Sequence, residues 1–488
     1  MAFYVTTPIF YVNAAPHLGH AYTTIAADVV ARHMRQRGED VFFLTGTDEH
    51  GEPVALAAER EGVTPRELAD RNAERFRALM PVLGASNDFF IRTSDPEHER
   101  AVQDVLQRVH DNGHVYKGLY EGWYCPRCAD FKSETEIGPG TTCPIHGIEL
   151  TREQEENWFF RLSTFQQALE ELLATDFVQP QARANEARAF VAQGLQDVSL
   201  TRGKITWGVP VPWDDGHVFY VWFDALLNYY TALTYAREGE DLTPRFWGAP
   251  TQHLIGKDIL KFHTIYWPAL LLAAGLDLPG RVFIHGFLLG HDGRKMSKSD
   301  GNVLDPFEVI DRFGTDALRY YLMRDVAFGE DGSVSMAGVE RRYETELAND
   351  LGNLASRTIA MVSRYRDGTV PSVRPDESLT AGLQDEVARA MDAWRISDAL
   401  EAIWQRVRRL NGYVEEQAPW KLAKDDARSA DLDRVLASLV AGLRTVAQEL
   451  LPFLPDTMAR LTAALDAGRL EPMQPLFPKR RDDDAAAA

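Results

Sequence analysis

The chain has 488 residues, a length that exceeds what one hydrophobic core usually supports and that predicts about three domains. Its 45% hydrophobic and 25% charged residues are typical of a globular protein. Because 72 acidic side chains outnumber 52 basic ones, the net charge of −20 argues against general affinity for nucleic acid and leaves room only for local, shaped contacts with RNA.

The N-terminus predicts a strand and not a targeting signal. Met1-Ala-Phe-Tyr-Val lacks the basic region and the long apolar region of a secretory signal. The longest apolar stretch, 266–275, is too short to cross a bilayer and contains Pro268, so it predicts a buried helix. We therefore expect a cytoplasmic protein without a membrane partner. Three cysteines are too few for a disulfide framework, so their positions matter more than their number.

The first fifty residues predict one strand–helix–strand unit. Residues 3–6 and 41–44 are short buried strands, and the amphipathic stretch 22–37 between them is a helix that Gly38 ends. Such a unit is typical of a doubly wound, mostly parallel sheet, which places the chain in the α/β class with a Rossmann-like fold.

Strand signals return in the middle of the chain. Short apolar runs at 218–222, 253–255 and 281–284 predict three more strands, and 259–274 predicts a helix between them. Residues 113–205 have a different texture, rich in aromatic residues, Gly and Pro, and hold every cysteine. The sheet is therefore predicted to be split by an insertion.

From Pro306 onward, long amphipathic runs predict an all-α helical bundle. The tail, 479–488, has no apolar periodicity and is predicted to be disordered.

The segment His17-Leu18-Gly19-His20 follows the first strand and opens the first helix. Open backbone N–H groups and the helix dipole favour phosphate there, Gly19 allows a close approach, and the two histidines offer donors. Taken alone, the segment is equally consistent with a capped helix start that carries incidental histidines.

The second motif, Lys295-Met-Ser-Lys-Ser299, lies in a polar loop after the strand that ends near His285. Lys295 and Lys298 could bring two ammonium groups to a triphosphate, although the motif alone could be a solvated basic loop. In this order, the two motifs resemble the signature pair of class I aminoacyl-tRNA synthetases. That resemblance implies ATP-dependent catalysis by positioning and charge stabilisation, with Mg²⁺ carried by ATP.

Five further segments resemble the methionyl-tRNA synthetases, and the likeness covers nearly the whole chain. They are 7–20, 43–51, 219–225, 255–263 and 416–420. The resemblance implies a ligase that joins L-methionine to AMP and then to the terminal adenosine of tRNA(Met). The implied domains are two catalytic halves (1–112 and 206–305), the insertion (113–205), a stem-contact linker (306–345), a helical anticodon-binding domain (346–478) and the tail (479–488).

The same resemblance implies two small-molecule sites. The methionine site comprises Ile9, Tyr11, Asp48, Trp222, Ala225, Tyr229, Ile259 and His263. The ATP site comprises His17, Gly19, His20, Gly256, Asp258, His285, Gly286, Lys295 and Lys298. An Asp can hold the substrate's ammonium group, and aromatic rings can enclose a thioether. Without the resemblance, Trp222 and Tyr229 would be read as core residues. Leu226 stands where the family often has proline.

Cys125-Pro-Arg-Cys128 and Cys143-Pro-Ile-His146 supply four ligands suited to tetrahedral Zn²⁺. Four protein ligands leave no open position, so one structural zinc ion is expected, as in bacterial-type relatives with a single zinc knuckle. The alternatives are a redox pair and unpaired buried thiols.

Asn353 and Arg357 stand four residues apart on the predicted helix 346–362, and both could reach one ligand. With Trp420 they resemble the family's anticodon-reading residues, and such residues read unpaired RNA bases by hydrogen bonding and stacking. A solvated Asn/Arg pair and a core Trp are the alternative.

Three rival functions can be weighed. Synthetases for isoleucine, valine or leucine need a larger insertion between the two motifs, and the cysteine enzyme would place zinc in its amino-acid pocket. A silent RNA-binding relative would not need the intact His and Lys residues. A small nucleotidyltransferase would lack the helical third of the chain. We expect a monomer with no DNA partner, because no dimerisation module is evident.

Overall fold

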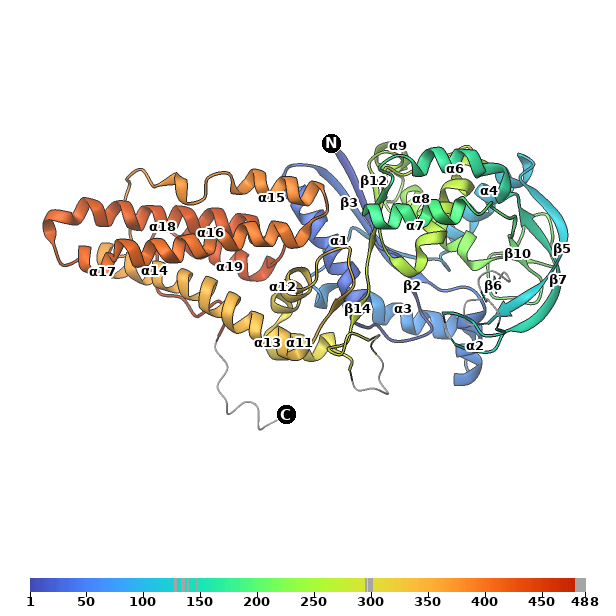
Figure 1. Ribbon diagram of the computed structural model, residues 1–488, viewed down its shortest axis with the longest axis horizontal. Helices are drawn as coiled ribbons and strands as arrows, with labels where there is room; N and C mark the ends of the chain where they lie inside the picture. Colours follow the sequence, from blue (N-terminus) through green and yellow to red (C-terminus); the bar gives the residue numbers. More distant parts are fainter. Residues whose placement is uncertain are drawn as a thin grey trace. The chain divides into compact units, whose positions relative to one another are not determined.

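The computed structural model describes residues 1–126, 130–132, 137, 140–145, 147–294, 296 and 302–478. The chain divides into two compact units, Met1–His285 and Gly286–Ala488. The first unit combines a sheet with helices, and the second is mainly helical (Figure 1). Within the described ranges, no helix is long and apolar enough to cross a membrane.

The first unit is built on a parallel sheet with the order β2-β3-β1-β12-β13-β8, and β4 pairs with β3. The strands are β1 (Ala2–Thr6), β2 (Phe10–Tyr11), β3 (Asp40–Asp48), β4 (Phe89–Arg92), β8 (Val178–Gln179), β12 (Thr251–Gly256) and β13 (Arg281–His285). The helices are α1 (Leu18–Gln36), α2 (Glu52–Glu61), α3 (Pro65–Val82), α4 (Pro96–Asp111), α6 (Gln166–Leu173), α7 (Gln181–Val191), α8 (Val221–Tyr235), α9 (Thr243–Phe246) and α10 (Trp267–Ala274).

Alternating burial along the strands explains why helices cover both faces of this sheet. Tyr4, Phe42 and Leu44 belong to one apolar core that also contains residues of α4 and α8. Val5 and Phe43 are fully buried as well, and successive side chains of a strand point to opposite faces. The helix α1 contacts β1, β3 and β12 and contributes nothing to the first core, so it covers the other face. The doubly wound α/β prediction is confirmed.

The insertion forms a second, antiparallel sheet and also contributes to the first one. Its order is β6-β5-β7-β9, in which β5 (Val115–Cys125) and β7 (Thr151–Phe160) form a long hairpin with β6 (Asp130–Lys132) and β9 (Val198–Ser199) at its edges. The short strand β8 instead pairs with β13 in the central sheet. The insertion therefore shares the central sheet at its edge.

The strand predicted at 218–222 is wrong in its extent and its partner. Only Val218–Phe219 forms a strand, β11, and it pairs antiparallel with β10 (Thr201–Arg202) outside the central sheet. The helix α8 begins at Val221 and contains Trp222. A short apolar run cannot by its periodicity distinguish a strand from the start of a buried helix.

The helix predicted at 259–274 is present, but its winding changes along its length. A 3-10 turn at Lys257–Ile259 leads into a π-helical segment at Phe262–Tyr266, which continues as α10. π segments are rare and occur frequently at functional sites. This one contains His263, one of the residues predicted to bind methionine.

The second unit confirms the predicted helical bundle, in which α14, α16 and α18 pack on one another (Figure 1). Its helices are α11 (Pro306–Phe313), α12 (Thr315–Asp325), α13 (Met336–Arg342), the π segment Tyr343–Gly352, α14 (Asn353–Arg366), α15 (Leu383–Asp392), α16 (Ile396–Gln417), α17 (Pro419–Leu422), α18 (Ser429–Leu450) and α19 (Pro455–Leu465). A two-strand pair joins β14 (Leu288–Leu289), which precedes α11, to β15 (Gly332–Ser333), which lies between α12 and α13.

Candidate active site

The carboxyl ends of the parallel strands gather many of the predicted site residues. The strand order reverses between β1 and β12, which lead to β3 on one side and to β13 on the other. In doubly wound folds, ligands bind in the crevice at the carboxyl edge where such a reversal occurs. β3 ends at Asp48, β12 at Gly256 and β13 at His285. Residues predicted for two different ligands therefore lie at one edge of the sheet.

The helix α1 begins with a cap made by two histidine side chains. Nδ1 of His17 accepts the backbone N–H of Gly19 at 3.1 Å, and Nδ1 of His20 accepts the backbone N–H of His17 at 3.0 Å. We expected open backbone N–H groups here, but these two are taken up by the cap. Because Nδ1 is an acceptor in each ring, the proton of the neutral ring is on Nε2, which can only donate.

The environment of His20 keeps its ring neutral. The His17 and His20 rings stack with centroids 3.7 Å apart, and the His20 ring also lies against Phe10 and Phe76. Burial lowers the pKa of His20 well below its usual value, and the neighbouring His17 lowers it further. The cap therefore presents hydrogen-bond donors and not fixed charges.

Three predicted methionine-site residues meet through one strand pair and one helix. Tyr11 of β2 is paired in register with Asp48 of β3. The Tyr11 ring lies edge-on to Trp222 of α8, with centroids 6.1 Å apart. Trp222 is half-buried, and its ring stacks flat on Phe262 at 3.8 Å. The aromatic wall predicted for a thioether is thus assembled from three separate segments of the chain.

A second predicted pair, Tyr229 and His263, is joined by a hydrogen bond of 2.7 Å between the Tyr229 hydroxyl and Nε2 of His263. Nδ1 of His263 lies 3.0 Å from the Ile259 carbonyl oxygen, to which it can only donate. Nε2 therefore accepts a hydrogen bond from the Tyr229 hydroxyl. Burial lowers the pKa of His263 to about 4 and raises that of Tyr229, so both groups stay neutral.

Asp48 is a buried carboxyl group with one oxygen that has no hydrogen-bond partner among the described residues. The residue is 2% exposed, and its Oδ1 atom is buried without a hydrogen-bond partner in the described part of the chain. Burial raises the pKa of this carboxyl well above its usual value, and the nearby Asp224 raises it further. An unsatisfied buried oxygen costs free energy, so its retention points to a ligand that satisfies it.

The remaining three methionine-site residues have packing positions. Ala225 is 3% exposed and follows Trp222 on α8 by three residues. Ile9 and Ile259 are partly buried and pack against the apolar core that contains residues of α4 and α8. Leu226, the departure from the family pattern, is 1% exposed and belongs to that core.

Four residues around Asp48 were not predicted from the sequence. Asp224 is fully buried and accepts hydrogen bonds from Nδ1 of His50 at 2.6 Å and from Nε2 of His98 at 2.8 Å. His50 is 2% exposed, and its Nε2 lies 3.6 Å from a Glu99 carboxylate oxygen. The only sequence signal was the run Asp48-Glu-His50 at the end of a buried strand.

The predicted nucleotide residues Gly256, Asp258 and His285 are close together. A Cβ atom on Gly256 would lie 2.6 Å from the Asp258 carboxylate and 3.7 Å from the His285 ring, so a side chain there would require the Asp258 carboxylate to move. Nε2 of His285 is 2.8 Å from the Thr23 hydroxyl, and its ring meets the edge of Tyr22. Asp258 is exposed, as a ribose contact requires.

Gly286 begins the second unit, and its own close contact is with the backbone of that unit. A Cβ atom at Gly286 would lie 2.3 Å from the Glu330 carbonyl group. The close approach of two backbones explains the glycine without reference to a ligand.

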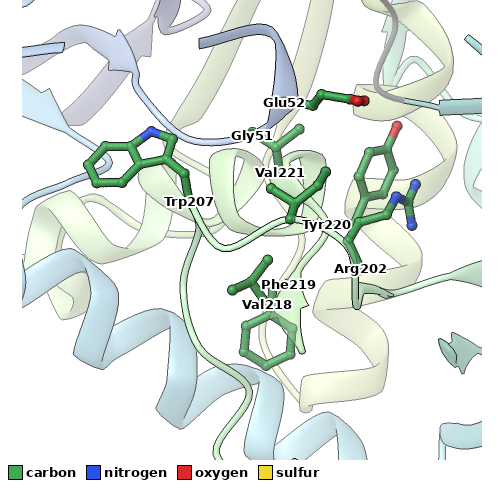
Figure 2. Close-up of a pocket in the computed structure, with 9 residues that line it drawn as sticks. Gly51, Glu52, Arg202, Trp207, Val218, Phe219, Tyr220 and Val221 are labelled. Atoms are coloured by element: carbon green, nitrogen blue, oxygen red, sulfur yellow. The ribbon is translucent and has the colours of Figure 1, made fainter. Parts of the chain in front are cut away.

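Figure 2 shows a small pocket next to the segment that carries Asp48. Its lining includes Gly51, Glu52, Arg202, Trp207 and Val221, none of which the sequence analysis selected. The pocket borders both the end of the Asp48–Gly51 segment and the start of α8. The Arg202 guanidinium lies 4.0 Å from the centre of the Tyr220 ring there.

Two of the four predicted zinc ligands lie in the described part of the chain. Cys125 and Cys143 are 0% and 1% exposed and share one small apolar cluster with Leu150. Cys128 and His146 lie outside the described residues. The set of four therefore extends beyond the part of the chain that the structure describes, and within that part no three His, Cys, Asp or Glu side chains form a metal-binding group. The close burial of two cysteines fits the predicted donor set.

The three predicted anticodon residues lie together in the helical unit. Asn353 is exposed at the start of α14, one turn before Arg357. The Arg357 guanidinium lies 5.9 Å from the centre of the Trp420 ring and forms a 2.8 Å ion pair with Glu415. Trp420 is half-buried in α17 and is therefore not the fully buried core residue of the alternative interpretation.

Lys295 and Lys298 lie outside the described residues, as does the predicted disordered tail, 479–488. Their predicted roles rest on the sequence.

Comparisons with known proteins agree with one another. The family model described as tRNA synthetases class I (M) matches residues 3–155 and 140–359. A methionine–tRNA ligase from Clostridium acetobutylicum is 44% identical over 474 residues, which cover 95% of this chain and 73% of the relative. One from Streptomyces coelicolor is 46% identical and matches 96% of this chain and 90% of the relative. The structure of Mycobacterium tuberculosis methionyl-tRNA synthetase with methionyl-adenylate has a TM-score of 0.92 and 40% identity over 98% of this chain and 100% of that one.

Proposed function

The chain belongs to the methionyl-tRNA synthetases, class I aminoacyl-tRNA synthetases, and from this premise we propose that it activates L-methionine with ATP and transfers it to tRNA(Met). In the first step a carboxylate oxygen of methionine bonds to the α-phosphorus of ATP, and pyrophosphate leaves. In the second, a hydroxyl of the terminal tRNA adenosine attacks the methionyl carbonyl carbon, and AMP leaves. The buried, open oxygen of Asp48 at the switch point carries the proposal.

Methionine recognition is assigned to the side chains around Asp48. Its carboxylate receives the substrate's ammonium group, because a buried anion without a partner is complementary to a cation. The Tyr11 and Trp222 rings enclose the thioether, to which sulfur–aromatic contacts are favourable. The neutral Tyr229–His263 pair closes the site without adding a charge that would compete for the ammonium group. Ile9, Ala225 and Ile259 supply apolar surface.

The chemical step requires that charge on the phosphates be stabilised. The Nε2–H groups of His17 and His20 are assigned as donors to the phosphates of ATP, which arrives with Mg²⁺. Gly256, Asp258, His285 and Gly286 are assigned to the nucleoside, and Lys295 and Lys298 to the pyrophosphate. These assignments come from the family resemblance, and the clustering of Gly256, Asp258 and His285 supports part of them.

Cys125, Cys128, Cys143 and His146 are proposed to hold one structural Zn²⁺ ion. The ion would fix the loops of the insertion and would take no part in the reaction, because four protein ligands leave no open coordination position. Elemental analysis of the purified protein should give one zinc per chain. Replacement of Cys143 by Ser should lower that content. A zinc content near zero in undamaged wild-type protein would contradict the assignment.

Asn353, Arg357 and Trp420 are proposed to read the anticodon by hydrogen bonding and stacking. The arrangement of an exposed amide, a guanidinium and a half-buried indole on neighbouring helices supports this role. A monomeric, cytoplasmic enzyme that binds neither membranes nor DNA remains our prediction.

The decisive test is ATP–pyrophosphate exchange measured with each of the twenty amino acids. Exchange should depend on methionine and exceed that with any other amino acid. A second assay should show methionine transfer to tRNA(Met). If exchange is absent with methionine, or greater with another amino acid, the proposed function is wrong.

A further inference from the structure

Three consecutive ionisable residues, the last residue of β3 and the two that follow it, are all buried. Asp48, Glu49 and His50 are 2%, 0% and 2% exposed. A buried charge is tolerated when it is paired and hydrogen-bonded, so the partners of each residue reveal its role.

Glu49 is the residue that is fully paired. Its two carboxylate oxygens accept hydrogen bonds from the Arg92 guanidinium at 2.7 and 2.9 Å, and from the hydroxyls of Thr47 and Ser94. Trp207 also donates to the Glu49 carbonyl oxygen, and its ring lies edge-on to His50 at 5.2 Å. The backbone that carries the three residues is thus fixed on both sides.

His50 has both ring nitrogens directed at carboxylates. Nδ1 lies 2.6 Å from Asp224, and Nε2 lies 3.6 Å from Glu99. Asp224 is itself held by His98, whose other nitrogen lies 2.6 Å from the Thr231 hydroxyl. An imidazole that faces carboxylates through both nitrogens is stabilised in the doubly protonated, cationic form.

We propose that His50, held between Asp224 and Glu99, is a positioning residue whose positive charge favours the ionised form of Asp48, the form that binds the ammonium group of the substrate. The inference rests on the proposed role of Asp48 in methionine binding. His50 touches no substrate in this account and acts only through Asp48.

The charges around the site support this role. The negative charge of Glu49 is balanced by Arg92. Tyr229 faces Asp48 from α8, the helix that also carries Asp224, and its hydroxyl is neutral. Glu99 and His98 face His50 and Asp224 from α4. With both aspartates ionised, His50 offsets one of their two negative charges, and the ammonium group of methionine would offset the other. Glu99, which is 31% exposed, adds a negative charge that solvent screens. Burial alone would lower the pKa of His50, but Asp224 and Glu99 raise it to about 10.

The test is the pH dependence of the methionine KM in His50→Gln, measured by pyrophosphate exchange at saturating ATP. Without the cation, the pKa of Asp48 rises, so Asp48 takes up a proton and binds ammonium weakly at lower pH. We expect the methionine KM of His50→Gln to be about tenfold or more above that of wild type at pH 6.5. The ratio of the variant's KM to the wild-type KM should decrease toward pH 9. The ATP KM should stay within about twofold.

Two more variants keep the test independent of folding. Glu99→Gln alters a side chain that is 31% exposed, and it should change the KM profile in the same direction but less. The matched control is His98→Gln, which removes the other histidine from Asp224; whatever its methionine KM, the pH dependence of that KM should run parallel to that of wild type. The inference would be overturned if the ratio of the variant's methionine KM to the wild-type KM did not depend on pH in both His50→Gln and Glu99→Gln. It would also be overturned if His98→Gln showed the same pH-dependent ratio as His50→Gln.

Failure of the inference can be told apart from failure of the proposed function. If wild-type protein shows no exchange with methionine, the function itself is wrong. If wild type is active and Asp48→Asn leaves the methionine KM unchanged, the role of Asp48 is wrong. If both behave as expected and the ratio of KM values for His50→Gln does not depend on pH, only the inference about His50 falls.

Discussion

Single residues in the site differ in whether their hydrogen-bonding capacity is used up within the protein. One nitrogen of His263 is hydrogen-bonded to the Ile259 carbonyl and the other to Tyr229, whereas one oxygen of Asp48 has no hydrogen-bond partner among the described residues. The first arrangement fixes a neutral wall, and the second leaves one place for charge. Specificity of this kind comes from polar groups that only the right ligand satisfies.

Asp48→Asn tests the open carboxylate with little change of shape. Loss of a buried charge partner costs about 2–4 kcal/mol, so the methionine KM should rise roughly 30- to 1000-fold. The ATP KM should change little, because Asp48 is assigned to the amino acid alone. Steady-state exchange kinetics measure both constants. An unchanged methionine KM would show that the ammonium group binds elsewhere.

His263→Gln tests the neutral wall through stability. The pKa of His263 is about 4 in the folded protein and its ordinary value is 6.5, so the unfolded chain binds the proton first as pH falls. The free energy of unfolding should therefore decrease between pH 6.5 and pH 4, by up to about 3 kcal/mol from this residue. Denaturant titrations of the first unit's transition should give a weaker decrease in His263→Gln. Equal decreases would contradict the buried neutral state.

At the scale of elements, the site depends on where strands and helices begin and end. Asp48 ends β3 and His50 follows it by two residues, and α8 carries Trp222, Asp224 and Tyr229 in its first three turns. The π-helical segment at 262–266 places His263 opposite Tyr229. A shift of any of these ends by one residue would turn its side chains away from the site.

Gly46→Ala tests the close pairing of β3 with β4. Gly46 pairs with Ile91 of β4, and a Cβ atom at Gly46 would lie 2.1 Å from the Ile91 carbonyl oxygen. The strands must separate, which should destabilise the first unit by at least about 2 kcal/mol and raise the methionine KM, because Asp48 is two residues away.

Gly412→Ala is the control for Gly46→Ala. Gly412 lies within α16, where the nearest atom to a new Cβ is 3.8 Å away, so alanine should stabilise the helical unit by up to about 1 kcal/mol. Thermal unfolding measures both variants. A Gly46→Ala protein as stable as wild type would show that β3 and β4 pair less closely than described.

At the scale of the whole molecule, the two units carry different tasks. The methionine residues all lie within Met1–His285, and the anticodon residues all lie within Gly286–Ala488. The proposed recognition of methionine and the proposed reading of tRNA are thus assigned to separate units, whereas Gly286, Lys295 and Lys298, which are assigned to ATP, belong to the second unit. A change at the proposed anticodon residues should therefore affect transfer to tRNA without affecting activation.

Trp420→Ala tests this separation. Loss of stacking on an unpaired base costs about 1–3 kcal/mol, so kcat/KM for aminoacylation should fall roughly 5- to 150-fold. Pyrophosphate exchange without tRNA should stay at the wild-type level. Trp420→Phe, which keeps an aromatic face, should lose less. Equal losses of exchange and aminoacylation in Trp420→Ala would remove its proposed role.

The sequence by itself determined the fold class, the positions of most of the strands that carry the site, and the family. Local apolar patterns are enough for strands such as 41–44 and 253–255, because burial on both faces leaves long apolar runs. Motifs at strand ends then located His17, Asp48 and Gly256. The run at 218–222 failed, because a short apolar segment fits a strand and a helix start equally well.

Only the tertiary structure decided which polar groups share a buried space. Asp224 is 174 positions from His50 in the chain, yet the two are joined at 2.6 Å. Whether Asp48 keeps an open oxygen depends on every neighbour that might have satisfied it. Burial and pairing are properties of the assembled core, and no local pattern encodes them. The sequence therefore identified the ligand-binding strands, and the packing of α4 and α8 against β3 determined the charge that the site presents.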